Sequence, residues 1–334
     1  MSFPLSESWR VHLPTWVSLP LVQHGDQLIA RVGGELRAIA AATGQAIWET
    51  VVDHAGGAGS FVHSYNDLYL TDRRPEPERL TELVAVRAGK LSFTVRLGCI
   101  VDRGASLIAA GILYAIGNAP DVGPVLRAVN LGTGKQVLDV ALGAGADMLG
   151  RDGDRLLVGN RMASPGLYWL EPDGSGLRAL EPSPAQEMRV SSGRVLAALR
   201  EHDTDASGRT AQVRDLASGA VLWSAPAQGP VIGLEGDSAV HYEGQGDERI
   251  PVLREAATGK PRWRGAAVED PSRVSFAGAY VFLGHTTGNV VHRHDDGRLV
   301  GALPLSRTAL AVDGAGGAGL IVVGGFKFLA AFKP

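Results

Sequence analysis

Short apolar runs separated by glycine-containing turns recur along the whole chain. The segment LRAIAAATGQAIWETVV at 36–52 returns in similar form at 126–142, 212–227 and 252–268, with three looser copies elsewhere. Each copy is an apolar or β-branched run, a turn of two to four residues ending in Gly, and a second run of the same kind, which is the pattern of two strands joined by a tight turn. Helical periodicity is nowhere sustained, so the pattern predicts an all-β protein.

The spacing of these turns predicts how many strands belong to each repeat. Two further short runs precede each hairpin, as at 231–236 and 238–244, so one repeat holds four strands. Four-stranded units at a period of about 40 to 45 residues are typical of β-propeller blades. The turn glycines that set this period are Gly44, Gly89, Gly134, Gly174, Gly219, Gly259 and Gly297.

The two ends of the chain predict an eighth blade. After the seventh turn the chain continues with only three more runs, at 308–314, 319–325 and 327–334. We expect residues 8–13 to supply the missing outer strand by pairing with 328–332, which also removes free sheet edges. The sequence therefore predicts an eight-bladed β-propeller of four-stranded antiparallel blades, with residues 1–334 forming a single domain.

The pattern of Ala38, Gly44 and Trp48, with Thr-Gly at several turns, resembles the repeat of the quinoprotein-like (PQQ-like repeat) eight-bladed propellers over essentially the whole chain. The resemblance implies that the small residue and the Trp dock neighbouring blades. The positions expected to do so are Ala38, Gly44, Trp48, Trp223, Trp263 and Trp9. Six residues before its turn glycine, blade 2 has Leu83 at the Ala38 position. Four residues after the turn glycine, four blades have an aromatic residue, namely Trp48, Phe93, Trp223 and Trp263, and the other three have Leu138, Arg178 and Gly301.

Two branches of that family imply different functions. The quinone-dependent dehydrogenases hold their cofactor with a vicinal cysteine pair, whereas Cys99 is the one cysteine here. The other branch is similar in size to this chain: the noncatalytic propeller lipoprotein of outer-membrane barrel assembly, which needs a lipidated cysteine after a signal peptide. A third set, the sensor propellers, requires no sequence feature that this chain lacks. We expect no cofactor.

Charge and the lengths of the apolar runs limit the partners and the location that we expect. The chain has 32 Lys and Arg against 35 Asp and Glu, a net charge of -3, so a nucleic-acid partner is not expected. Its start shows no basic segment followed by a long apolar run, and no apolar stretch is long enough to span a bilayer. We expect a cytoplasmic protein without membrane insertion, or a periplasmic one if a leader has been removed.

Two groups of residues have side chains that could bind a metal ion. Asp203, Asp205, Ser207 and Gly208 echo the start of a calcium loop, but Arg214 stands where the loop needs a Glu, which favours a solvated hairpin. His292 and His294 are two apart in an expected strand, near His285, Asp295 and Asp296. We interpret them as a polar blade face and not as metal ligands. No motif of a catalytic nucleophile is found, so we expect no enzyme activity.

Insertions between the second and third strands predict the binding face. They occur at 71–82, 117–124, 201–210 and 243–249. Because strands alternate in direction, these loops emerge on the face that also carries the connections between blades, and insertions gathered on one face often mark the binding face. Their mixed charge with Arg suits a protein partner. The candidate partner-binding residues are Arg73, Arg74, Glu76, Glu78, Arg79, Glu201, His202, Asp203, Asp205, Arg209, Asp247 and Glu248.

The main hypothesis is therefore a noncatalytic scaffold that binds another protein through the inserted loops. Three alternatives stay open: a propeller that binds or senses a small, quinone-like molecule, an enzyme with its active site at the mouth of the central channel, and loops that are merely tolerated on the surface.

Overall fold

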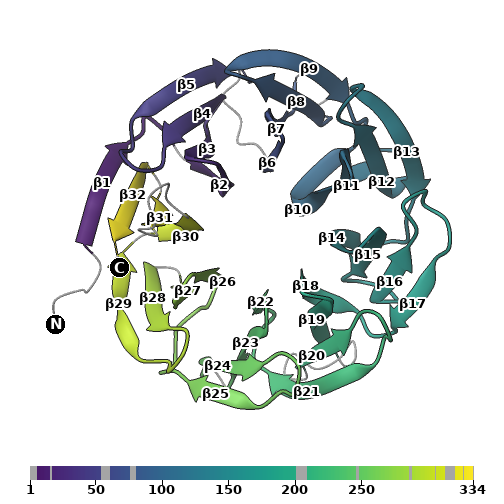
Figure 1. The fold of residues 1–334 in the computed structure, drawn as a ribbon. Helices are drawn as coiled ribbons and strands as arrows, with labels where there is room; N and C mark the ends of the chain where they lie inside the picture. The colour runs from purple at the N-terminus through teal and green to yellow at the C-terminus, as the bar shows by residue number, and fades with distance from the viewer. Residues whose placement is uncertain are drawn as a thin grey trace. The chain divides into compact units, whose positions relative to one another are not determined.

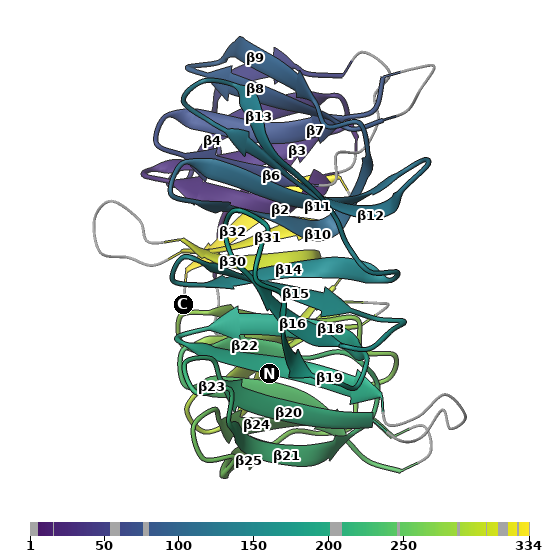
Figure 2. The same cartoon turned by 90° about the vertical axis from the view of Figure 1, so that its right-hand side faces the viewer.

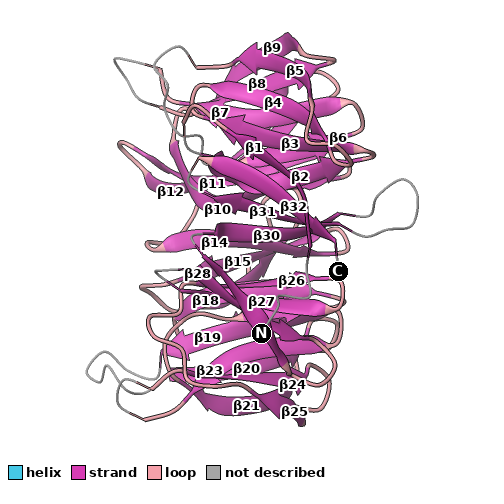
Figure 3. Ribbon diagram, turned by 90° about the vertical axis from the view of Figure 1, so that its left-hand side faces the viewer, coloured by secondary structure: helices cyan, strands magenta, loops and turns pink. Residues whose placement is uncertain are grey.

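The computed structural model contains strands, turns and loops. Every regular element within the described ranges is a strand (Figure 3). In the same ranges no helix is long and apolar enough to cross a bilayer. The structure describes residues 6–15, 17–53, 61–75, 80–200, 209–245, 248–285, 288–304, 306–312, 320–325 and 327–333.

The strands form eight four-stranded antiparallel sheets, each a blade, which confirms the predicted all-β eight-bladed propeller (Figure 1). By its internal contacts the chain divides into two compact units, Met1–Ala141 with Leu305–Pro334, and Leu142–Pro304. The first unit holds blades 8, 1, 2 and 3, and the second holds blades 4 to 7. That the whole chain is one domain stays a prediction.

The first unit contains the blades nearest the two chain ends. Blade 1 is β2 (Val17–His24), β3 (Gln27–Val32), β4 (Glu35–Ala40) and β5 (Ala46–Val51). Blade 2 is β6 (Val62–Tyr65), β7 (Leu68–Arg73), β8 (Glu82–Arg87) and β9 (Lys90–Arg96). Blade 3 is β10 (Ile100–Ala109), β11 (Ile112–Ala119), β12 (Gly123–Asn130) and β13 (Lys135–Ala141). Blade 8 is β30 (Ser306–Val312), β31 (Leu320–Gly325), β32 (Phe328–Lys333) and β1 (Ser6–His12).

The second unit has the same strand order in every blade. Blade 4 is β14 (Ala146–Asp152), β15 (Arg155–Asn160), β16 (Leu167–Leu170) and β17 (Arg178–Glu181). Blade 5 is β18 (Ala185–Ser191), β19 (Arg194–Arg200), β20 (Arg209–Asp215) and β21 (Val221–Ala227). Blade 6 is β22 (Gly233–Glu235), β23 (Ser238–Glu243), β24 (Ile250–Glu255) and β25 (Pro261–Arg264). Blade 7 is β26 (Arg273–Ala277), β27 (Tyr280–His285), β28 (Gly288–Arg293) and β29 (Leu299–Pro304).

Blade 8 is completed by both chain ends, as the sequence predicts. The amino-terminal strand β1 pairs antiparallel with β32, with Trp9 opposite Ala331 and Val11 opposite Leu329. The predicted strand at 8–13 begins two residues earlier, at Ser6, and ends one residue earlier, at His12. Leu13 still donates its backbone N–H to the Lys327 carbonyl at 2.8 Å and is buried. The edge of β32 is thereby covered by chain from the opposite end of the sequence.

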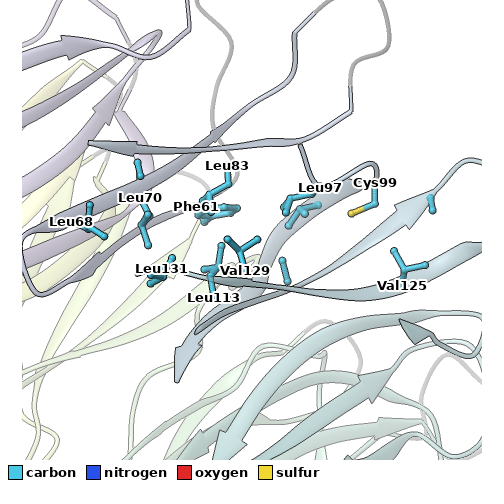
Figure 4. Close-up of a cluster of buried hydrophobic side chains, with 14 residues drawn as sticks. Phe61, Leu68, Leu70, Leu83, Leu97, Cys99, Leu113, Val125, Val129 and Leu131 are labelled. Atoms are coloured by element: carbon cyan, nitrogen blue, oxygen red, sulfur yellow. The ribbon is translucent and has the colours of Figure 1, made fainter. Parts of the chain in front are cut away.

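Within each unit, apolar side chains fill the space between adjacent blades. Between blades 2 and 3, for example, Leu70 and Leu83 of one blade pack in one cluster with Leu113 and Val129 of the other, each at most 1% exposed (Figure 4). Strands in the middle of a blade are buried on both faces, as in β7 and β8, whereas the outer strand β9 alternates exposed and half-buried residues. Adjacent blades of the same unit therefore cover each other's apolar faces.

A bulky ring on the outer strand of one blade lies against the turn glycine of the next. Gly44 has φ +74°, a conformation that favours glycine, and a Cβ there would approach Trp9 Cε3 to 2.7 Å. The Trp9 indole Nε1 also donates to the Ala41 carbonyl at 2.8 Å. The same contact joins Trp48 to Gly89, Phe93 to Gly134, Trp223 to Gly259, and Trp263 to Gly297.

Two positions of the expected repeat are shifted by turn length. In blade 2 the residue opposite Phe93 is Ala85, so Ala85 and not Leu83 is equivalent to Ala38, which is opposite Trp48. In blade 4 the turn between β16 and β17 is longer than in blade 1. Counting from Gly174 therefore assigns Arg178 to the Trp position, whereas Leu180 makes the contact with Gly219.

Candidate partner-binding face

The loop face of each unit consists of the connections between the second and third strands of its blades, together with the connections between blades. The antiparallel order of every sheet places these two kinds of connection on the same side. Of the expected insertions at 71–82 and 243–249, the described residues between the strand ends, 74–75, 80–81, 244–245 and 248–249, lie outside strands; of the insertion at 201–210, only 209–210 are described, and they belong to β20. The fourth, at 117–124, is different, because β11 and β12 extend through most of it and leave a turn at 120–122. Figure 2 shows the β11–β12 hairpin projecting at the right of the view.

The structure describes four of the twelve candidate partner-binding residues, namely Arg73, Arg74, Arg209 and Glu248. The other eight lie outside the described residues: Glu76, Glu78, Arg79, Glu201, His202, Asp203, Asp205 and Asp247. Arg209 is half-buried at the start of β20, opposite Arg200 and Ala227. Glu248 is exposed, and its backbone N–H donates to the Gln245 carbonyl at 3.1 Å.

Arg73 and Arg74 tie neighbouring blades together. The Arg73 Nε lies 2.9 Å from Glu82 Oε2, and its Nη1 donates to the Val52 carbonyl, which follows blade 1, at 3.2 Å. Arg74 extends the other way, donating from Nη2 to the Val101 carbonyl of blade 3 at 2.6 Å. Their described hydrogen bonds stabilise the junctions of blade 2 with blades 1 and 3. That these two arginines also contact a partner stays a prediction.

A third arginine, Arg31, which is not among the residues predicted from the sequence, joins blades 1 and 2 and is more deeply buried than Arg73 and Arg74. Arg31 is fully buried near the end of β3 and donates from Nη1 to Thr71 Oγ1 at 3.2 Å and to the Asp72 carbonyl at 2.6 Å, both in blade 2. Its Nη2 also lies 3.6 Å from Asp53 Oδ2. Burial lowers the pKa of Arg31, and the carboxylates of Asp72 and Asp53 oppose that shift. The guanidinium is thus a buried clamp between blades 1 and 2.

In each unit, one loop of the loop face exposes a large apolar side chain. Val122, in the β11–β12 turn of the first unit, is 59% exposed. Met162, in the β15–β16 loop of the second unit, is 82% exposed, the highest value among the exposed large apolar side chains of the described residues. Neither residue is among the candidates predicted from the sequence, because those candidates are charged or polar loop residues. The signal was available, since Met162 interrupts an otherwise small and polar segment, NRMASPG.

The backbone under Met162 is held in place by a set of contacts that we call the Met162 platform: Gly145, Asn160, Arg161, Ser164 and Pro182. Asn160 is 2% exposed, and its Oδ1 accepts hydrogen bonds from the backbone N–H groups of Met162 and Ala163, each at 3.0 Å. Arg161 donates its N–H to the Gly145 carbonyl at 3.1 Å. A buried amide is therefore used to fix the conformation of an exposed loop.

Two side-chain contacts anchor the loop to its flanking segments. The Ser164 hydroxyl donates to the Pro182 carbonyl at 2.5 Å, which joins the loop to the connection after β17. The Arg161 Nε lies 2.8 Å from Asp147 Oδ2 on β14. Space is also tight beneath the loop, because a Cβ at Gly145 would approach Met162 Cβ to 2.7 Å. Met162 thus lies, exposed, on a loop whose conformation is fixed by contacts with its flanking segments; we call this a braced loop.

The histidines considered as metal ligands contact other parts of the protein. His292 is 3% exposed, its ring is stacked on Trp263 with centroids 5.4 Å apart, and its Nδ1 lies 2.9 Å from the Gly297 carbonyl. His294 Nε2 lies 2.7 Å from Ser238 Oγ in blade 6. No group of three or more potential metal ligands occurs within the described residues. The calcium-like segment at 203–208 lies outside them.

Two further titratable groups are buried. His241 is fully buried in β23, and its Nε2 accepts a hydrogen bond from Arg254 Nε at 3.0 Å, while Nδ1 has no partner among the described residues. Burial lowers the pKa of His241 to about 4, so the ring is neutral at pH 7. Cys99 is also fully buried, and burial raises the pKa of its thiol to about 11. The thiol is therefore protonated and shielded.

One Ser–His contact lies on the inner strands of the first unit. His63 Nε2 in β6 is 2.9 Å from Ser106 Oγ in β10, so the contact joins blades 2 and 3. Burial lowers the pKa of His63 to about 4. A neutral imidazole can accept the proton of a hydroxyl, which is the chemical requirement for a serine nucleophile.

Comparisons with known proteins agree on the fold. No protein-family model and no curated protein matches the chain. Among solved structures, BamB from Moraxella catarrhalis has 14% identity and a TM-score of 0.70 over 99% of this chain and 98% of that one. The quinohemoprotein alcohol dehydrogenase ADHIIG from Pseudomonas putida HK5 has 12% identity and a TM-score of 0.71 over 98% of this chain and 76% of that one.

Sqt1 from Saccharomyces cerevisiae has 9% identity and a TM-score of 0.72, with full coverage of both chains. At these identities the likeness concerns the fold alone. The resemblance to quinoprotein-like propellers that the repeat indicates is confirmed at that level: the chain has the fold of an eight-bladed β-propeller of this type.

Proposed function

We propose that the protein is a noncatalytic scaffold that binds a partner protein on its loop face, with Met162 as a central contact. The observation that carries this proposal is the 82% exposure of a large apolar side chain on a braced loop. A single exposed apolar residue is ordinary on a protein surface. What distinguishes Met162 is the buried Asn160 amide that fixes its backbone.

The physical argument rests on preorganisation. A loop that is already ordered loses little conformational entropy on binding, so more of the contact energy is retained as affinity. Methionine is suited to such a contact because its flexible, polarizable thioether adapts to irregular apolar pockets. We therefore infer that the partner presents an apolar pocket to Met162. The charged side chains next to it in the loop and on β14, Arg161 and Asp147, pair with each other.

Variants of the chain test this function by comparing two exposed positions. Met162→Asp places a charge on the loop face, and Ile47→Asp is the matched control, because Ile47 is 46% exposed on the outer strand β5. Wild type and both variants are used as baits in the native host, and candidate partners are purified for measurement of Kd. A partner should bind wild type and Ile47→Asp equally, and Met162→Asp at least about tenfold more weakly. Equal binding by all three proteins would contradict the proposal.

A second candidate function is hydrolysis by a serine nucleophile, favoured by the 2.9 Å contact between His63 and Ser106. A fluorophosphonate probe, which reacts with activated serines, tests it directly. Labelling that disappears in Ser106→Ala and in His63→Ala would support an enzyme, and the absence of labelling in the native protein would remove this candidate. Among the sequence-based alternatives, a quinone-like ligand stays a prediction, although one structural neighbour is by name a quinohemoprotein alcohol dehydrogenase.

A further inference from the structure

The described methionines differ sharply in exposure. The chain has 4 Met, of which Met148, Met162 and Met188 lie in the described ranges. Met148 is 7% exposed and Met188 is 5% exposed, both within the apolar cluster between blades 4 and 5. Met162 is 82% exposed. Oxidation of a thioether requires an oxidant to reach its sulfur, so exposure determines which methionine reacts.

The cysteine does not compete for oxidant. The reactive form of a cysteine is its thiolate, and Cys99 combines full burial with a thiol pKa of about 11. Its side chain belongs to the apolar cluster between blades 2 and 3 that also contains Leu97 and Val125 (Figure 4). Among the described sulfur-containing residues, Met162 is thus the exposed one, whereas Met148, Met188 and Cys99 are buried.

We propose that Met162 is a redox modification site, and that its conversion to the sulfoxide releases the partner. The release of the partner rests on the proposed function, whereas the oxidation of Met162 does not. In the reaction, hydrogen peroxide transfers one oxygen atom to the thioether. A sulfur–oxygen bond forms, the peroxide oxygen–oxygen bond breaks, the sulfur is oxidised by two electrons, and the peroxide is reduced to water.

The structure indicates why the modification would alter binding but not folding. The Met162 platform holds the loop through backbone groups and the side chains of Asn160, Arg161 and Ser164, and none of these contacts uses the Met162 side chain. The sulfoxide replaces an apolar, flexible contact with a polar one, which an apolar pocket excludes because the new oxygen would lose its hydration. Methionine sulfoxide is reducible by methionine sulfoxide reductases, so the contact can be restored.

Peptide mapping tests the chemistry without any partner. The full chain is treated with graded hydrogen peroxide, and the sulfoxide at each methionine is quantified by mass spectrometry while the Tm is monitored. Met162 should react at least about tenfold faster than Met148 and Met188, with the Tm unchanged. Comparable rates at the three residues, or oxidation of Met162 only after unfolding, would overturn the proposal.

Binding experiments test the consequence. Peroxide should raise the partner Kd of wild type at least about tenfold, and reductase treatment should restore it. Met162→Leu keeps an apolar side chain without sulfur, so its Kd should stay unchanged by peroxide, whereas Met162→Gln should resemble the oxidised protein. If Met162→Asp abolishes binding but selective oxidation does not, this inference is wrong and the proposed function stands. If Met162→Asp binds normally, the proposed function fails whatever the oxidation rates.

Discussion

Replacement of Trp263 by Ala tests the docking of one blade on the next. Trp263 lies on β25 of blade 6, is 7% exposed, and rests on the turn of blade 7, where a Cβ at Gly297 would overlap its Cγ. Its ring stacks on His292 with an interplanar angle of 18°, and its Nε1 donates to the His294 carbonyl at 3.2 Å. The substitution removes apolar burial, stacking and one hydrogen bond together.

The magnitude follows from these contacts. A Trp side chain buries about 150–250 Å², which at about 25 cal/mol per Å² corresponds to about 4–6 kcal/mol. Partial collapse of the site reduces this figure, and Trp→Ala replacements in protein cores cost about 3–5 kcal/mol. We therefore expect Trp263→Ala to lower the free energy of unfolding by about 3–5 kcal/mol. Trp263→Phe should cost less, about 1–3 kcal/mol, because it chiefly leaves the His294 carbonyl without its donor.

Urea titration followed by circular dichroism measures both losses. A double-mutant cycle with Gly297→Ala then isolates the contact itself. Gly297 has φ +69°, so an Ala there carries a backbone cost of about 1–2 kcal/mol in any background. The overlap with the indole is an additional cost that only the Trp263 protein incurs, so the two substitutions should be non-additive. A loss below about 1 kcal/mol in Trp263→Ala, or strict additivity with Gly297→Ala, would refute the docking argument.

Three further predictions concern the chain end and two buried groups. Deletion of residues 1–13 removes β1 and uncovers the edge of β32, so we expect a lower Tm and aggregation in size-exclusion chromatography; a truncated protein that melts like the full chain would contradict this. The pKa of His241 in the folded protein, about 4, lies below its ordinary value of 6.5, so protonation favours the unfolded state. Its contribution to stability is complete above pH 6.5 and is lost as the pH falls towards 4. In urea titrations at several pH values, His241→Gln should lower the number of protons taken up on unfolding by up to one. Finally, iodoacetamide should modify Cys99 only as fast as the protein unfolds, because the thiol is buried and protonated at pH 8; rapid alkylation of the folded chain would show an exposed thiol.

The architecture could be predicted because it repeats. Turn glycines recur wherever a tight hairpin needs a residue with positive φ, and their spacing alone indicates blades of four strands. The pairing of the two chain ends followed from counting, since the last blade had three runs and the first strand had no partner. Errors arose where a blade departs from the average turn length, as in blade 4, where a fixed offset from Gly174 selected Arg178 while Leu180 makes the contact.

The candidate site was harder to predict, because exposure and hydrogen bonding depend on neighbouring blades. Arg73 and Arg74 have the charge expected of a partner-binding surface, yet their guanidinium groups bond to carbonyls of blades 1 and 3. The segment 117–124 of blade 3 is likewise predicted from the sequence as an inserted loop, whereas β11 and β12 extend through most of it. Conversely, an apolar residue such as Met162 in a loop could equally have packed inward. Only the positions of Asn160 and Ser164 show that its loop is fixed with the side chain outward.

Site-specific photo-cross-linking tests the central claim most directly. A benzophenone amino acid is introduced at position 162, and separately at position 47 on the outer strand β5, in the full chain expressed in its native host. The account predicts that the probe at position 162 captures one partner chain reproducibly, that peroxide treatment of the wild type displaces the same partner, and that the probe at position 47 does not capture it. Capture of that partner from position 47 and not from position 162 would place the binding surface elsewhere and contradict the account.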